Sequence, residues 1–353
     1  MEFLLYGANG YTGQLIAENA ERFGIVPVLA GRSEEKIKPL AKRLGYDYKI
    51  FTLEEINKLD AALKNVNVVL NAAGPFQHTA RPVMEACIRT QTHYLDITGE
   101  IPVFELAASF DQQAKDAGIL IMSGVGFDVV PTDCLALFLK KQLPDATHLK
   151  LAFYSNGGVS HGTAMTMAEN LGEGSAVRKN GKIIKVPLGH KTMWIPFDED
   201  KERLVMTIPW GDVSTAYYST GIPNIETYSA VKPSTYKKLR WQKFFNWLLR
   251  LPFVRAIIKR QVSKRTAGPS EEKLKNSRSY VWGEVKNALG QTKQAKLNTP
   301  NGYWLTMLTS LTVLKKVLNG KKAELTGFQT PAGGFSEDLI MQIESVERHN
   351  IIK

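Results

Sequence analysis

Cysteine and long apolar runs are scarce in this sequence of 353 residues. Its two cysteines, Cys87 and Cys134, are too few for a disulfide framework and have no zinc-ligand spacing around them. No apolar run reaches the roughly 18 residues of a membrane-spanning helix, and the N-terminus has no basic or long apolar region typical of a signal peptide. We therefore expect a cytoplasmic protein, in a compartment where thiols stay reduced. The six histidines are scattered, so no metal site is predicted.

Most of the chain also lacks an excess of either charge. The formal net charge is +11, but residues 232–275 contain 13 Lys or Arg and 2 Asp or Glu. This basic segment accounts for the whole excess, and the remainder of the chain is neutral. A neutral body with one basic segment is not typical of a nucleic-acid-binding protein, and no nucleic acid is expected as a partner.

Short apolar runs alternate with amphipathic spans in the N-terminal part of the chain. The predicted strands are Phe3–Tyr6, Pro27–Ala30, Tyr48–Phe51, Val66–Ala72, Tyr94–Ile97 and Ile119–Met122. Helix-like spans separate most of them. This alternation predicts parallel strands joined by helical crossovers, which is a doubly wound Rossmann sheet of the α/β class.

The pattern changes near Pro131. Alternating segments such as Leu149–Tyr154 and Ser279–Lys286 predict a mixed, mainly antiparallel sheet, and the last run of the chain, ending near His349, is helix-like. The expected parts are a Rossmann domain, a second α+β domain and a C-terminal segment packed back on the first, over residues 1–133, 134–325 and 326–353.

A glycine motif follows the first predicted strand and opens a helix. The run Gly7-Ala8-Asn9-Gly10-Tyr11-Thr12-Gly13 has the spacing GxxGxxG. The first two glycines allow a tight turn close to a pyrophosphate, and the third lets the helix pack closely on the strand. The exposed amides at the start of the helix would face the phosphates. The motif therefore predicts dinucleotide binding, with Gly7, Asn9, Gly10, Tyr11, Thr12 and Gly13 as cofactor-binding residues.

The second predicted strand ends in Gly31-Arg32-Ser33. NAD-binding sites usually carry Asp or Glu near this point, to bind the ribose 2′-hydroxyl. Here the guanidinium of Arg32 would attract a 2′-phosphate instead, and Ser33 could donate to that phosphate and cap the following helix. The residues therefore favour NADP as the cofactor.

The fourth predicted strand ends in Asn71-Ala72-Ala73-Gly74-Pro75-Phe76. Ligands of an open parallel sheet lie past the carboxyl ends of its strands, and small residues there let a ligand approach the backbone. We expect all six residues of this loop to support the cofactor.

The motifs occur in one order with two more, Tyr94-Leu95-Asp96-Ile97-Thr98-Gly99-Glu100 and Gly126-Phe127-Asp128-Val129-Val130-Pro131-Thr132-Asp133. Together they resemble the saccharopine dehydrogenase-like oxidoreductases, in particular the branch of trans-acting enoyl reductases. The resemblance covers residues 1–133 well and continues more weakly through Ser160–Thr163, Gly302-Tyr303 and Gly327–Phe335. It implies an N-terminal Rossmann domain for NADP, a second α+β domain and a C-terminal segment that returns to the first.

The family that the chain resembles contains two chemistries, reduction of an imine between an amino acid and an aldehyde, and reduction of a carbon–carbon double bond on an acyl chain. Saccharopine-forming enzymes need basic residues to hold substrate carboxylates, whereas the candidate site segments offer only His78 and His161. These segments are Asn71–Thr79, Tyr94–Glu100, Gly124–Asp133 and Tyr154–Glu169. We therefore expect an NADPH-dependent oxidoreductase that reduces a neutral, lipid-like or acyl substrate with an enoyl or carbonyl group. A saccharopine-type imine-reducing dehydrogenase and a non-catalytic NADPH-binding sensor or membrane-surface protein remain the alternatives.

Asp96, Asp128 and His161 are the candidate catalytic residues. Asp96 shares one face of a predicted strand with Tyr94 and Thr98, at the end where the cofactor would lie. It could equally cap a helix or hold the loop. Asp128 lies in a segment that lines the nicotinamide in the proteins that the chain resembles, and His161 could donate a proton at neutral pH. The predicted substrate contacts are Tyr94, Thr98, Gly126 and Phe127.

Aromatic and basic residues interleave in the basic segment 232–275. Such a pattern is typical of a helix at a membrane interface, and it also fits an acidic acyl carrier. An ordinary helix pair packed on the second domain, with solvated basic side chains, is the third interpretation. The expected partners are thus a small-molecule or carrier-bound acyl substrate and, through this segment, a membrane surface or an acidic carrier. Self-association as a homodimer is left open.

Overall fold

The computed structural model describes residues 2–157, 160–169, 171–197, 201–242, 246–262, 268–320 and 325–351. The chain forms two units, one of Met1–Val130 with Tyr303–Gly334 and one of Pro131–Gly302 with Phe335–Lys353. The chain therefore returns to the first unit at Tyr303, earlier in the sequence than predicted. It leaves this unit again after Gly334, so residues 335–353 belong to the second unit. The prediction that the whole of 326–353 packs on the Rossmann domain was wrong for these residues.

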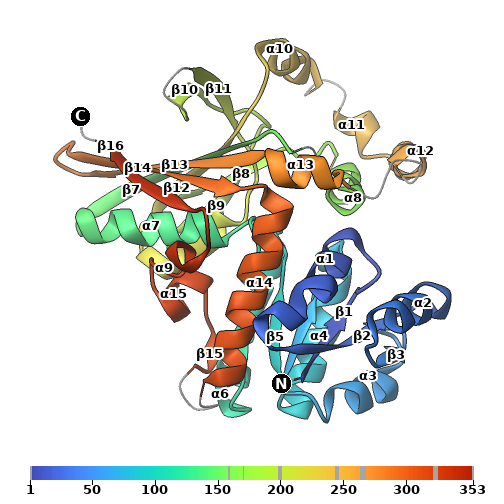
Figure 1. The fold of residues 1–353 in the computed structure, drawn as a ribbon. Helices are drawn as coiled ribbons and strands as arrows, with labels where there is room; N and C mark the ends of the chain where they lie inside the picture. The colour runs from blue at the N-terminus through green and yellow to red at the C-terminus, as the bar shows by residue number, and fades with distance from the viewer. Residues whose placement is uncertain are drawn as a thin grey trace. The chain divides into compact units, whose positions relative to one another are not determined.

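The first unit contains a seven-stranded sheet in the order β15-β6-β5-β4-β1-β2-β3, and every pairing is parallel (Figure 1). This order, running outward on both sides of β1 and β4, confirms the predicted Rossmann sheet. The strands are β1 (Glu2–Tyr6), β2 (Val26–Gly31), β3 (Tyr48–Ile50), β4 (Val68–Asn71), β5 (His93–Asp96), β6 (Leu120–Met122) and β15 (Gly327–Phe328). Its helices are α1 (Tyr11–Asn19), η1 (Ala20–Phe23), α2 (Glu34–Leu44), α3 (Ile56–Leu63), α4 (Phe76–Thr90), α5 (Ile101–Ser109), α6 (Asp111–Asp116) and α14 (Gly302–Asn319).

Side chains that alternate along these strands build the core of the first unit. Leu4, Val69, Tyr94 and Ile121 occupy one row across four neighbouring strands, and all are buried. They pack in one apolar cluster with residues of α3, α4 and α5. Because this core fixes the strands in register, the ends of β1, β4 and β5 are held at one edge of the sheet.

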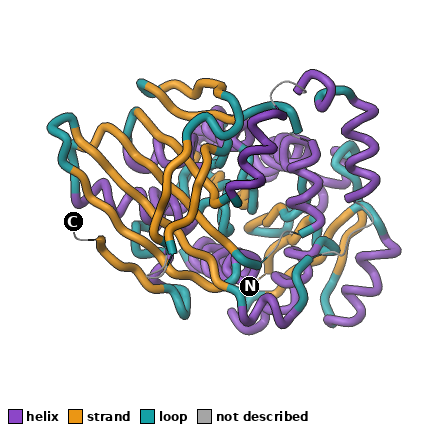
Figure 2. Tube along the Cα trace, turned by 90° about the horizontal axis from the view of Figure 1, so that it is seen from above, coloured by secondary structure: helices purple, strands orange, loops and turns teal. Residues whose placement is uncertain are grey.

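The second unit contains a nine-stranded sheet. Its strands are β7 (Ala146–Ser155), β8 (Ser175–Lys179), β9 (Lys182–Val186), β10 (Thr192–Pro196), β11 (Glu202–Thr207), β12 (Asn224–Ala230), β13 (Arg278–Asn287), β14 (Thr292–Pro300) and β16 (Glu347–Ile351). Seven of them follow the order β10-β11-β12-β7-β13-β14-β16, and Figure 2 shows the long strands side by side. β12 and β7 run parallel, whereas the other pairs are antiparallel. The predicted mixed, mainly antiparallel sheet is therefore confirmed.

A helix packs closely on this second sheet. α7 lies so close to β13 that a Cβ atom on Gly283 would come within 2.8 Å of the Leu139 side chain. The helices of the second unit are α7 (Val130–Gln142), α8 (His161–Glu169), α9 (Asp212–Thr220), α10 (Pro233–Gln242), α11 (Asn246–Leu249), α12 (Pro252–Val262), α13 (Glu271–Asn276) and η3 (Ile340–Gln342). Most of α15 (Pro331–Phe335) belongs to the first unit, which ends at Gly334. The predicted helix near His349 was wrong, because this run forms β16 and pairs with β14. Its Arg348 guanidinium lies over the Phe138 ring of α7, 3.8 Å from the ring centre.

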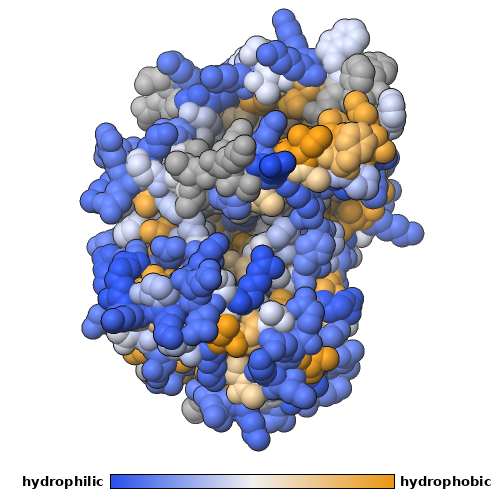
Figure 3. Space-filling model, turned by 90° about the vertical axis from the view of Figure 1, so that its right-hand side faces the viewer, coloured by the Kyte–Doolittle hydropathy of each residue, from blue (hydrophilic) through white to orange (hydrophobic). Residues whose placement is uncertain are grey.

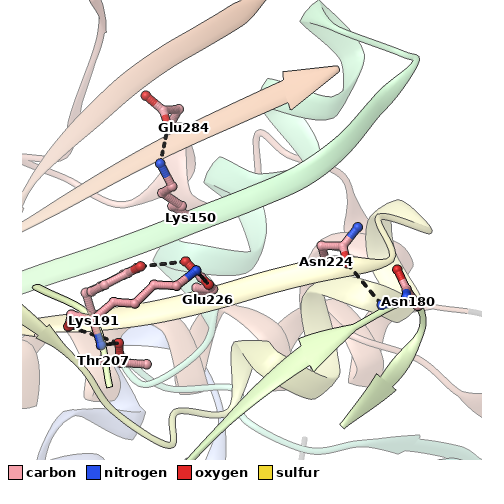
Figure 4. A network of polar contacts seen from close by, with 8 residues as sticks. Lys150, Asn180, Lys191, Thr207, Asn224, Glu226 and Glu284 are labelled. Carbon is pink, nitrogen blue, oxygen red and sulfur yellow. Dashed lines mark hydrogen bonds and ion pairs between the residues drawn. The ribbon is translucent and has the colours of Figure 1, made fainter. Parts of the chain in front are cut away.

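A row of charged residues crosses the same sheet. Glu226, Lys150 and Glu284 are register partners on β12, β7 and β13, and the ammonium group of Lys150 is 2.8 Å from the Glu284 carboxylate (Figure 4). Lys191 forms an ion pair with Glu226. Burial acts to raise the pKa of Glu226, but hydrogen bonds from Lys191 and Tyr228 outweigh it and lower that pKa. These pairs hold the charged side chains of this row together within the second unit.

Candidate active site

The turn after β1 brings the glycine motif against the loop after β4. Gly7 has a φ of +83°, and a Cβ atom there would lie 2.8 Å from the backbone nitrogen of Ala73. A Cβ atom on Gly13 would lie 2.4 Å from the Gly7 carbonyl oxygen, so α1 can approach the turn only with glycine at that position. These two contacts fix the chain at the point where the sheet order reverses, between β1 and β4.

The N-terminus of α1 has the form of a phosphate site. Gly10 precedes the helix, and no side chain caps it with a hydrogen bond. A Cβ atom on Gly10 would meet only the Gly7 carbonyl oxygen, at 3.3 Å, so the space above the turn is open. Tyr11 and Thr12 begin the helix and are half-buried, as is Asn9. Uncapped amides beside open space fit the pyrophosphate of a dinucleotide.

Arg32 lies at the carboxyl end of β2, where the sequence predicted a 2′-phosphate site. Its side chain is exposed, and it makes no ion pair or hydrogen bond with the described residues. Its charge acts on the Tyr6 hydroxyl of the neighbouring strand, where it opposes the burial that raises the pKa of Tyr6 to about 12. Ser33 precedes α2, but its side chain makes no capping hydrogen bond, so that part of the prediction was wrong. Both side chains are thus available to a phosphate.

The loop after β4 is held by the Asn71 side chain. Its Oδ1 accepts a hydrogen bond from the Ala73 nitrogen at 3.0 Å, and its Nδ2 donates to Thr79 Oγ1 at 3.1 Å. Because Asn71 is fully buried, its side chain shapes the loop, and Ala72, Ala73, Gly74 and Pro75 present mainly backbone. The peptide between Gly74 and Pro75 is cis, and Phe76 begins α4.

The Asp96 side chain, at the end of β5, accepts three hydrogen bonds. One oxygen accepts from the nitrogens of Thr98 and Gly124, both at 2.9 Å, and the other accepts from the Tyr94 hydroxyl at 2.8 Å. The side chain is 0% exposed, and burial raises its pKa. A carboxyl group that is enclosed and already bonded on both oxygens holds the two loops together, and we revise its predicted catalytic role to this structural one.

Two predicted substrate contacts are corrected with it. Tyr94 is fully buried in the core of the first unit, and its hydroxyl is committed to Asp96. Thr98 is fully buried as well, and its Oγ1 accepts from the Glu100 nitrogen at 3.0 Å. Tyr94 and Asp96 share a face of β5, as alternation predicted, whereas Thr98 lies beyond the end of this strand. All three side chains are buried, so this side of the strand is closed.

The loop at 124–129 is anchored by α14, far along the sequence. Thr306 Oγ1 accepts from the Phe127 nitrogen at 3.0 Å, and Thr309 Oγ1 donates to the Val125 carbonyl at 2.8 Å. A Cβ atom on Gly126 would lie 2.8 Å from the Thr306 side chain, so glycine permits this close approach. The sequence analysis missed Thr306 and Thr309, although polar residues three apart in an apolar helix were a signal for a buried polar face.

Asp128 and Glu100 form a pair of carboxyl groups beside this loop. The two Glu100 oxygens accept from the nitrogens of Phe76 and Gln77 at 2.9 and 2.8 Å, so this carboxylate caps α4. A Cβ atom on Gly99 would lie 2.8 Å from Asp128 Oδ2. Burial, and then the Glu100 charge, raise the pKa of Asp128 to about 7. Asp128 is half-buried, and its carboxyl makes no hydrogen bond within the described part of the chain. It can therefore carry a proton at neutral pH and give it to a ligand.

His161 is the first residue of α8, in the second unit. Ser160 caps this helix, since its Oγ accepts from the Thr163 nitrogen at 3.2 Å. The structure thus brings the glycine turn, Arg32 and Asp128 to one edge of the first sheet, whereas His161 belongs to the other unit. Its predicted catalytic role stays a prediction.

The N-terminal part of the chain matches a known domain, and longer stretches resemble curated proteins. Residues 3–122 match the family model described as saccharopine dehydrogenase NADP binding domain. A lipid droplet localized protein of Caenorhabditis elegans is 25% identical over 330 residues, which cover 80% of this chain and 77% of the worm protein. A trans-acting enoyl reductase of Mycobacterium tuberculosis is 29% identical over 201 residues, 53% of this chain but only 48% of the enzyme.

A solved structure has the same fold. Apo saccharopine dehydrogenase (L-Glu forming) from Saccharomyces cerevisiae superposes with a TM-score of 0.65, at 13% identity, over 99% of this chain and 100% of the yeast chain. The glycine turn, the uncapped helix and the exposed Arg32 are the features that an NADP-binding domain requires. Residues 3–122 of this chain therefore match the NADP-binding domain of the saccharopine dehydrogenases, and the chain is similar to the oxidoreductases named above.

Proposed function

We propose that this oxidoreductase uses NADPH to reduce a neutral, lipid-like or acyl substrate at an enoyl or carbonyl group, with Asp128 as the proton donor. The observation that carries the proposal is the carboxyl pair. Glu100 is held by two backbone amides, and its charge helps to keep Asp128 protonated near neutrality. A reductase requires such a donor, because hydride addition leaves negative charge on the substrate.

The cofactor would be held by the residues of the first unit. The turn at Gly7 and Gly10 and the first amides of α1 would bind the pyrophosphate. The guanidinium of Arg32 and the hydroxyl of Ser33 would bind the 2′-phosphate, a charge-assisted contact that NADH cannot form. The backbone of 72–75 would support the remainder. When bound, NADPH supplies the hydride.

Asp128 would complete the reduction. As the hydride reaches one carbon, the O–H bond of Asp128 breaks and its proton goes to the neighbouring carbon of an enoyl group or to a carbonyl oxygen. The substrate thereby gains two hydrogens, and Asp128 becomes a carboxylate that regains its proton from water. Gly124 and Phe127 hold the loop at this point through their backbone nitrogens, which donate to Asp96 and Thr306. The donor is thus held by a rigid loop.

The residues near the pair favour a neutral substrate. No Lys or Arg occurs in 71–79, 94–100 or 124–133. A substrate with two carboxylates would leave those charges without partners beside the Glu100 carboxylate, which is unfavourable. The M. tuberculosis relative is named an enoyl reductase, and the worm relative is named for lipid droplets. Both names support an acyl or lipid substrate over an amino diacid.

A substrate panel tests the proposal. NADPH oxidation is followed by absorbance with long-chain 2-enoyl thioesters, long-chain carbonyl compounds, and an amino acid mixed with a dicarboxylic semialdehyde. We expect turnover with an acyl substrate and loss of about 100-fold or more of it in Asp128→Asn. Turnover with the amino acid mixture alone would favour the imine-reducing alternative. NADPH binding without turnover of any substrate would favour the sensor.

A further inference from the structure

We propose that α11 and α12 form a surface that docks on anionic lipid membranes. We call it the docking surface, and its exposed apolar residues are Trp247, Leu248, Phe253 and Ile257. Figure 3 shows apolar side chains gathered in the upper part of the view, at the height of α11 and α12 in Figure 1, among hydrophilic ones. None of the described helices is long and apolar enough to cross a membrane, so the attachment would be at the surface.

α12 exposes the side that a surface helix normally buries. Phe253, Ala256, Ile257 and Arg260 are spaced at i, i+3, i+4 and i+7, which places them on one face, and all four are exposed. Phe253 is 60% exposed and Ile257 is 55% exposed. The outward stripe of this helix is therefore mainly apolar, with a basic residue at its end.

The opposite face of α12 binds its own unit through charged groups. The Lys259 ammonium lies 2.6 Å from the Glu169 carboxylate of α8, and the Arg255 guanidinium lies 2.6 Å from the Glu173 carboxylate. Ile258 and Val262 pack in the same small cluster as residues of α8. These contacts fix the orientation of α12, so the fold itself turns the apolar stripe outward.

Charge identifies the partner as anionic. The basic segment 232–275 has a large excess of Lys and Arg. Lys237 and Lys238 on α10 are exposed near its end, and Trp241 follows them with 69% exposure. Tryptophan prefers the boundary between headgroups and acyl chains, and basic residues there are attracted by anionic lipid.

A lipid surface fits these observations better than an acidic carrier protein. The outward stripe of α12 is mainly apolar, with Arg260 at its end, whereas an acidic carrier would be recognised mainly by a cluster of outward cations. A stripe of isolated aromatic and aliphatic side chains gains most from insertion among acyl chains, since about 25 cal/mol is gained for each Å² of apolar area removed from water. The proposal is independent of the reductase chemistry.

Vesicle cosedimentation without cofactor or substrate tests the proposal. The full chain is mixed with vesicles of phosphatidylcholine alone or with about one third phosphatidylglycerol. We expect binding to the anionic vesicles, about tenfold weaker binding to the neutral ones, and weakening by added salt. Trp247→Ser and the double variant Phe253→Ser/Ile257→Ser should each weaken binding by about tenfold or more.

A matched control distinguishes binding through this docking surface from non-specific binding through any exposed apolar side chain. Trp194 on β10 is 57% exposed, close to the 67% of Trp247, but lies outside the segment. Trp194→Ser should leave vesicle binding unchanged. The circular dichroism spectrum and the urea unfolding midpoint should be the same in all these variants, which shows that the second unit folds. Equal weakening by Trp194→Ser, no binding to any vesicle, or binding to an acidic acyl carrier protein instead of vesicles would each overturn the proposal.

Discussion

The Asp128 carboxyl and the Glu100 carboxylate lie at the same edge of the Rossmann sheet, and burial and then the Glu100 charge raise the pKa of Asp128 to about 7. Glu100 is fixed on the N-terminus of α4, where the helix dipole and two amides stabilise a negative charge. Asp128 lies against Gly99, is half-buried, and has a pKa of about 7. One carboxyl is thus kept charged and its neighbour neutral, an arrangement that suits acid catalysis.

Removing the Glu100 charge should shift the pH profile. Glu100→Gln takes away a cause of the raised pKa of Asp128, so that pKa should fall by about one unit. The proton donor is then lost at lower pH, and kcat should decline at lower pH than in the wild type. The measurement is the kcat–pH profile between about pH 5 and 9. Glu85→Gln, an exposed change on α4, is the control and should leave the profile in place. If the midpoint of the kcat–pH profile were unchanged in Glu100→Gln, the Glu100 charge would not affect the pKa of Asp128.

Asp128 should also link folding to pH. Its pKa is about 7 in the folded protein, above the ordinary value of an aspartate, so folding favours the protonated form. Stability from this group is complete below about pH 4 and is lost as the pH rises towards 7. Asp128→Asn keeps a neutral side chain at every pH. At pH 8 the free energy of unfolding of the variant should therefore be about 1–2 kcal/mol higher than that of the wild type, allowing for partial solvation of the group. Urea unfolding at pH 4 and pH 8 measures this; an advantage of the same size at both pH values would mean that Asp128 does not cause it.

Arg32 should decide which cofactor is preferred. Arg32→Ala removes the guanidinium from the end of β2, and NADPH affinity should drop about 10- to 100-fold, because a charge-assisted hydrogen bond contributes about 1.5–3 kcal/mol. NADH affinity should change little. Calorimetric titration of both nucleotides measures this, with Arg22→Ala, an exposed change on η1, as the control. If Arg32→Ala weakened the binding of NADPH and NADH equally, the assignment of Arg32 as the residue that binds the 2′-phosphate would be wrong.

Thr306 should affect turnover through the loop that it anchors. Thr306→Val removes the acceptor of the Phe127 nitrogen, which should lower the free energy of unfolding by about 1 kcal/mol. The adjacent Asp128 loses its fixed position, so kcat should fall several-fold while the affinity for NADPH stays the same. Thr312→Val on the same helix is the control. Loss of cofactor affinity in Thr306→Val would point to a wider disruption of the first unit.

Local pattern was sufficient to predict the Rossmann sheet. Most strands from β1 to β6 are short, largely apolar runs between helices, and the glycine turn follows the first of them. The end of the chain was harder. Residues 347–351 have no strong strand pattern, and their place beside β14 comes from sheet pairing and from the packing of Arg348 on Phe138. Such long-range contacts override weak local preference.

In the candidate site, too, some features could be predicted from local sequence, whereas others depend on long-range contacts. Gly7 and Arg32 could be singled out because their chemistry follows from strand ends and sequence motifs, whereas Asp128 was singled out through the family resemblance. Alternation placed Tyr94, Asp96 and Thr98 on one face but could not show that the face is closed by Asn71 and by the loop at Gly124. Thr306 is separated from Phe127 by 179 residues, and no local signal connects them.

The most direct test of the account is NADPH-dependent reduction of a long-chain 2-enoyl thioester by the wild type and by Asp128→Asn across the pH range. The account predicts wild-type turnover that declines above about pH 7, and a variant that binds NADPH as tightly but turns over about 100-fold more slowly, with no decline near that pH. A variant with the rate and pH profile of the wild type would contradict the assignment of Asp128 as the proton donor.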